Sequence, residues 1–69
     1  MEQITITIAD MDSGDSTSRP VPTMSKKVLK EAIMEFEEDS GYRKYELMCE
    51  DIVEDSDILE VLDDLNVTY

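Results

Sequence analysis

The sequence predicts a small single α+β domain over residues 1–69, with the order strand, strand, helix, strand, helix. Three observations predict this class: a period-two apolar pattern at the start, two later stretches with helical apolar spacing, and 41% hydrophobic residues. A chain this short buries only about 60% of the surface that it exposes when unfolded. Its core is therefore thin, and homodimer formation is one way to stabilise it.

The first predicted strand is QITITIAD, residues 3–10. Ile4, Ile6 and Ile8 alternate with polar residues, which is typical of a strand with one buried face. This stretch is the clearest strand pattern in the sequence.

A polar turn is predicted over 10–18, centred on Gly14. A second strand is expected in RPVPT, residues 19–23. Pro20 and Pro22 have no amide hydrogen, so this strand is expected at an edge of the sheet.

The main helix is predicted over 24–40, with Thr23 or Ser25 as its N-cap and Gly41 as its stop. Apolar side chains form one stripe that can pack on the sheet, namely Val28, Leu29, Ala32, Ile33 and Phe36. The charges oppose the helix dipole, because lysines occupy the first turns and acids crowd the last. Each misplaced charge costs roughly 0.3–1 kcal/mol before screening, so something other than helix stability placed them.

Residues 42–51, YRKYELMCED, fit two patterns. Tyr45, Leu47 and Cys49 alternate as in a strand, but a helix also fits, with one apolar face made of Tyr45, Met48, Cys49, Ile52 and Val53. We favour the strand because a clear strand with one proline-broken neighbour needs a third partner.

A short acidic helix is predicted over 56–65, capped by Asp55 or Ser56. Its apolar residues share one face, namely Ile58, Leu59, Val61, Leu62 and Leu65. The closing stretch NVTY is a candidate for a short terminal strand.

This order of elements resembles the ubiquitin-like β-grasp, and the resemblance covers most of the chain, including the YEL stretch after the main helix. Ubiquitin-like modifiers and sulfur carriers act through a C-terminal Gly-Gly. The present sequence ends Val67, Thr68, Tyr69, so conjugation and sulfur transfer are not expected of it.

The charge is strongly negative and uneven. Eighteen acids and six bases give −12, and residues 45–69 hold nine acids and no base. Such a surface repels nucleic-acid phosphates and anionic lipid and attracts basic proteins, so direct nucleic-acid binding and membrane binding are not expected. The sequence has no apolar run of membrane-spanning length and no signal-peptide pattern, which predicts a cytoplasmic protein.

The side chains argue against catalysis, because there is no histidine and Cys49 has no imidazole to activate it. We expect no enzyme, no cofactor and no metal site. The stretch DMDSGDS resembles the start of a calcium loop, but Gly14 lies at its fifth position instead of its sixth, and Val21 stands where that loop needs glutamate. A turn held by local Asp and Ser hydrogen bonds is the simpler interpretation.

Acids form one row on each predicted helix: Glu31, Glu35 and Glu38 on the first, and Asp57, Glu60 and Asp64 on the second. Carboxylates three or four residues apart on a helix lie roughly 5–6 Å from one another, similar to successive phosphates of a nucleic-acid strand. Such an array should compete with DNA for a cleft of lysines and arginines. With no base nearby in sequence, the counterions of the acids after residue 45 are expected on another molecule. The predicted phosphate-mimic residues are Glu31, Glu35, Glu38, Asp39, Glu46, Glu50, Asp51, Glu54, Asp55, Asp57, Glu60, Asp63 and Asp64.

In size, acidity and lack of catalytic groups, the sequence resembles the small acidic proteins that phages make early in infection. Several of these are DNA mimics that inhibit the nucleoid protein HU, uracil-DNA glycosylase, the sliding clamp or CRISPR effectors. The resemblance implies an inhibitor of a basic host DNA-binding protein, acting in the host cytoplasm. Two alternatives stay open: a ubiquitin-like adaptor that binds through an apolar sheet face, and a subunit of a larger assembly whose acids only solubilise it.

Overall fold

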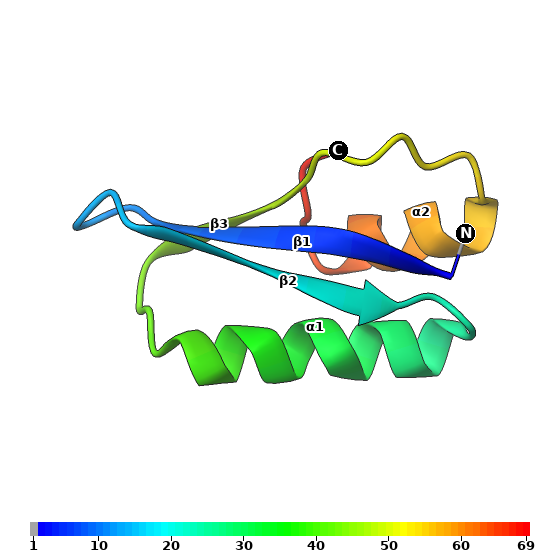
Figure 1. Ribbon diagram of the computed structural model, residues 1–69, viewed down its shortest axis with the longest axis horizontal. Coiled ribbons are helices and arrows are strands. Elements are labelled where there is room, and N and C mark those ends of the chain that lie inside the picture. The colour runs from blue at the N-terminus through cyan, green and yellow to red at the C-terminus, as the bar shows by residue number, and fades with distance from the viewer. Residues whose placement is uncertain (1) are drawn as a thin grey trace.

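The computed structural model describes residues 2–69 as a three-stranded sheet with two helices (Figure 1). The elements are β1 (Gln3–Asp10), β2 (Ser16–Pro22), α1 (Lys26–Ser40), β3 (Tyr45–Cys49) and α2 (Ser56–Asp64). The strand order is β2-β1-β3, and both outer strands run antiparallel to β1. The predicted α+β class and element order are confirmed, whereas nothing beyond that order supports the β-grasp.

Strand β2 lies at an edge of the sheet, where proline is tolerated because it need not donate a backbone hydrogen bond. The amide of Thr5 on β1 points toward the β3 side, where it donates to the Asp51 carboxylate at 2.7 Å. Thr5 faces Pro20 on β2, so this pair exchanges no backbone hydrogen bond and Pro20 needs no amide hydrogen. The strand begins at Ser16, earlier than predicted, because the serines and threonine ahead of Arg19 extend the ladder along β1.

The end of the chain covers the edge of β3. Thr68 forms a parallel bridge with Met48, donates its amide hydrogen to the Leu47 carbonyl at 2.9 Å, and accepts one from Cys49 at 2.8 Å. The expected terminal strand is therefore a single bridge. Because β3 is held between β1 and this bridge, the strand interpretation of this stretch is confirmed and the helical one is wrong.

Both helices begin and end close to the predicted positions. Ser25 caps α1 by accepting a hydrogen bond from the Val28 amide at 3.1 Å, and Gly41 ends it at φ 70°, a conformation that favours glycine. Asp55 caps α2 by accepting a hydrogen bond from the Asp57 amide at 2.9 Å. Among residues 2–69, neither helix is long and apolar enough to cross a membrane.

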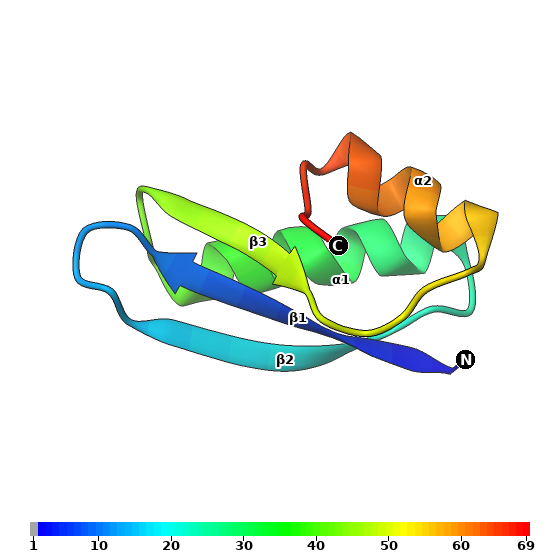
Figure 2. The ribbon, with the colours of Figure 1, turned by 90° about the horizontal axis from the view of Figure 1, so that it is seen from above.

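One hydrophobic core lies between the sheet and the helices. Viewed from above, α1 lies behind the sheet and α2 lies toward the β3 side (Figure 2). The buried side chains are Ile4, Ile6, Ile8, Val21, Leu29, Ile33, Phe36, Leu47, Cys49, Ile58, Val61, Leu62 and Val67. No helix of residues 2–69 covers the other face, which we call the bare sheet face (Figures 1 and 2). Both helices and the core thus occupy one side of the sheet.

Candidate functional site

The acidic surface belongs to the helices and loops. Side chains on the strands alternate, so those that face away from the buried isoleucines form the bare sheet face. Within the strands this face is made of hydroxyl, amide, proline, alanine and methionine side chains, with Glu46 as its acid. Within the strands the bare sheet face thus carries one acid, and the other predicted phosphate-mimic residues lie on the helices and on the loop between β3 and α2.

The structure divides the thirteen predicted phosphate-mimic residues into two sets. The engaged set pairs with a cation or accepts a hydrogen bond inside the chain, and consists of Asp39, Asp51, Asp55, Asp57, Glu60 and Asp63. The open set has no side-chain partner among the described residues, and consists of Glu31, Glu35, Glu38, Glu46, Glu50, Glu54 and Asp64.

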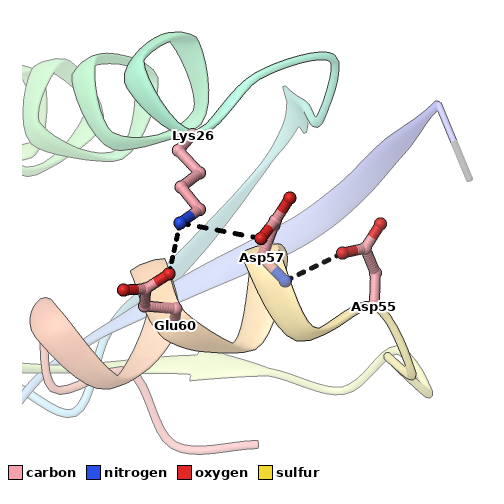
Figure 3. Close-up of polar contacts among 4 residues, drawn as sticks. All are labelled: Lys26, Asp55, Asp57 and Glu60. Atoms are coloured by element: carbon pink, nitrogen blue, oxygen red, sulfur yellow. Dashed lines mark hydrogen bonds and ion pairs between the residues drawn. The ribbon is translucent and has the colours of Figure 1, made fainter.

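Lys26 accounts for two members of the engaged set (Figure 3). Its Nζ lies 3.6 Å from the Asp57 carboxylate and donates to Glu60. The hydrogen bond and the charge of Glu60, followed by the charge of Asp57, raise the pKa of Lys26. The expectation that acids after residue 45 find no cation within the chain is wrong here, because α1 and α2 pack together. All three side chains are exposed, so salt screens this contact.

Arg19 forms an ion pair with Asp39 in the last turn of α1. The guanidinium lies 3.0 Å from the Asp39 carboxylate and 4.7 Å from the centroid of the Phe36 ring. Arg19 therefore compensates one of the acids that oppose the helix dipole. The neighbouring Glu35 and Glu38 have no such partner among residues 2–69.

Two other engaged carboxylates accept hydrogen bonds from other segments of the chain. Asp51 accepts the Thr5 amide hydrogen just beyond the end of β3, and Asp63 accepts the hydroxyl hydrogen of Tyr69 at 2.7 Å. Sequence reasoning missed both roles, because no local pattern connects Asp51 with a residue 46 positions earlier.

Three of the seven carboxylates of the open set lie together. Glu31, Glu35 and Glu38 line a shallow groove along α1 and the turn that follows it. The rest of this α1 groove consists of Met34, Glu37, Gly41, Tyr42 and Tyr45. Met34 is 49% exposed, and both tyrosines are half-buried. The groove thus combines carboxylates with aromatic and thioether surface.

The groove also concentrates negative charge. It lies at the carboxyl end of α1, where the helix dipole is negative and the last turn holds no basic residue. Burial raises the pKa of Glu37. Burial, followed by the charge of Glu37, raises the pKa of Tyr45. A cation entering here would relieve several unfavourable interactions at once.

Glu37 makes the stability of the fold depend on pH. Because its pKa is higher in the folded protein than the ordinary 4.5, folding favours the protonated form. The contribution of Glu37 to stability is therefore fully present below the unfolded pKa and is lost as pH rises through the folded pKa. Glu37→Gln should raise the urea midpoint at pH 7, and this gain should shrink on acidification below 4.5. An equal gain at both pH values would contradict burial as the cause, and Glu38→Gln, which removes an exposed charge one position away, measures the part of the gain that comes from charge alone.

The acidic turn near Gly14 is held by hydrogen bonds among its own residues. Asp10 accepts hydrogen bonds from the Asp12 amide at 3.0 Å and the Ser13 hydroxyl at 2.8 Å, which lower the pKa of its carboxyl. The amide of Asp15 donates to the Ser13 hydroxyl at 3.2 Å. The local turn interpretation is confirmed. In the part of the chain that the structure describes, no group of three or more potential metal ligands is found.

Comparisons of the chain with protein-family models, with curated proteins and with solved structures found no match.

Proposed function

We propose that the protein is a non-enzymatic inhibitor whose carboxylates take the place of DNA phosphates on a basic host DNA-binding protein. Such a partner is a nucleoid-associated, repair or replication protein in the host cytoplasm. The observation that carries this proposal is the open set, seven carboxylates without a side-chain partner in residues 2–69. The lysines and arginines of a DNA-binding cleft would supply the missing counterions.

Solubility alone is a weaker explanation of the charge. A small domain stays soluble with a net charge of magnitude about 2–8. The formal charge here is −12, which exceeds that range and adds self-repulsion to a thin core. Selection for binding explains the excess better than selection for solubility does.

The ubiquitin-like adaptor has less support. That function needs an apolar sheet face, and the large exposed hydrophobic side chains of residues 2–69 lie outside the strands. They are Met11, Met24, Met34, Ile52 and Tyr69. Mimicry uses the surface that is charged, whereas adaptor binding would need a large apolar surface, and the bare sheet face offers only proline, alanine and methionine side chains among polar ones.

The test is competition with DNA. A fluorescent DNA duplex bound to a purified basic nucleoid protein such as HU is titrated with this protein at rising salt, and anisotropy is recorded. We expect displacement at low salt and, by analogy with multi-phosphate contacts, a loss of affinity on the order of 10²-fold or more between 50 and 200 mM salt. Uracil-DNA glycosylase and a sliding clamp are titrated in parallel. If DNA is displaced from none of the three proteins, the proposal is contradicted. If this protein binds one of them with an affinity that does not depend on salt, the adaptor function is favoured.

A further inference from the structure

We infer that the α1 groove anchors the partner by receiving an arginine side chain from it. This inference rests on the proposed function and deepens it, because it selects one part of the acidic surface and one chemistry. The groove offers three things to a guanidinium: carboxylates without a partner, tyrosine rings, and the flexible side chain of Met34.

The groove carboxylates oppose folding. Glu35 lies four residues after Glu31 and three before Glu38, so like charges face one another along the helix. Glu38 also lies in the last turn, where the dipole disfavours an acid. Among residues 2–69 none of the three receives a compensating cation. Charges that the fold does not compensate are the ones that a binding partner can neutralise with the largest gain.

The other row of acids is already neutralised in part. Asp57 and Glu60 on α2 share Lys26, whose positive charge would repel an incoming cation (Figure 3). An arginine from a partner would have to displace Lys26 or share its carboxylates. On the α1 side, Arg19 is committed to Asp39 and Phe36, and no ion pair to Glu31, Glu35 or Glu38 is found among residues 2–69. The structure thus favours the α1 groove over α2.

The aromatic lining favours arginine over lysine. A guanidinium is planar and weakly hydrated, stacks flat on aromatic rings and bonds a carboxylate through two donors in a fixed fork, whereas an ammonium is a compact and strongly hydrated point charge. Tyr42 follows the Gly41 cap directly and Tyr45 begins β3, so both rings are held by ordered backbone. Met34 can adapt to the aliphatic part of the incoming side chain.

The first test maps the contact. The ¹⁵N-labelled protein is titrated with a ten-residue peptide of alternating arginine and glycine, and then with the lysine equivalent. We expect saturable shift changes in the amides of Met34, Glu35, Gly41, Tyr42 and Tyr45, and several-fold tighter binding of the arginine peptide. Changes centred on α2, or equal affinity for both peptides, would overturn the inference.

The second test removes charge in matched pairs. Glu35→Gln with Glu38→Gln takes two charges from the groove, and Glu54→Gln with Asp64→Asn takes two from exposed positions elsewhere in the open set. We expect the first pair to weaken arginine-peptide binding and DNA displacement by about tenfold, and the second by less than about twofold. Met34→Ala and Tyr42→Leu keep the charge and should each weaken arginine-peptide binding more than lysine-peptide binding.

The outcomes separate this inference from the proposed function. If DNA is displaced but both charge pairs weaken displacement equally, the groove is not the anchor and mimicry stands. If the arginine peptide binds the groove but DNA is never displaced, the groove site stands and mimicry fails. Circular dichroism of every variant excludes loss of fold as the cause of weaker binding.

Discussion

Ile33→Ala is expected to lower the free energy of unfolding by about 2–4 kcal/mol, because it opens a cavity that the thin core fills poorly. The Ile33 side chain is fully buried in α1, on the face that packs against the sheet. A chain of 69 residues has a total stability of roughly 3–10 kcal/mol. The substitution should therefore remove a large fraction of the stability and leave part of the population unfolded at 37 °C.

Urea unfolding followed by far-UV circular dichroism measures this effect, and the next residue on the helix supplies the control. Met34 is 49% exposed, so Met34→Ala removes little buried surface while the residue remains a good helix former. We expect it to change stability by less than about 1 kcal/mol. Similar losses for both variants would mean that α1 does not pack on the sheet through the Ile33 face.

Local patterns predicted most of the elements. The isoleucine alternation of β1 and the apolar stripe of α1 each need only neighbours in sequence, and both were predicted within two residues of their bounds. The start of β2 was missed because its serines and threonine resemble a turn. These residues become a strand by pairing with the strongly β-forming β1, which is a tertiary effect.

The candidate site was predictable only in part. The row of Glu31, Glu35 and Glu38 follows from helical spacing and was predicted. Its tyrosines were not assigned to it, although the position of Tyr42 directly after the stop signal Gly41 is a local hint that the ring folds back on the helix end. The capture of Asp57 and Glu60 by Lys26 carries no such hint, because it depends on how the two helices pack.

The partition into engaged and open carboxylates gives the acids two different physical roles. An engaged carboxylate such as Asp51 completes backbone hydrogen bonding or, like Asp39, balances a nearby cation. An open carboxylate such as Glu38 only adds repulsion within the folded chain. If the open carboxylates are kept because they bind a partner, neutralising them should weaken binding and should not destabilise the fold.

The strongest form of this prediction neutralises the whole open set, with Gln for each Glu and Asn for Asp64. The formal charge then changes from −12 to −5, which still lies in the range of about 2–8 in magnitude that keeps a small domain soluble. Less self-repulsion should leave the urea midpoint unchanged or higher, since each like-charge pair on a helix costs a few tenths of a kcal/mol.

In the same variant, displacement of DNA from a basic nucleoid protein should weaken by more than about 100-fold, because all seven uncompensated charges contribute to attraction. Fluorescence anisotropy at fixed salt measures displacement, and urea unfolding of the same preparation shows that the fold is kept. Mimicry requires that competition with DNA is lost while stability is kept or raised. If the parent displaces DNA and the neutralised variant does so equally well, the open carboxylates serve only solubility, and the contact must lie on the engaged set or the bare sheet face.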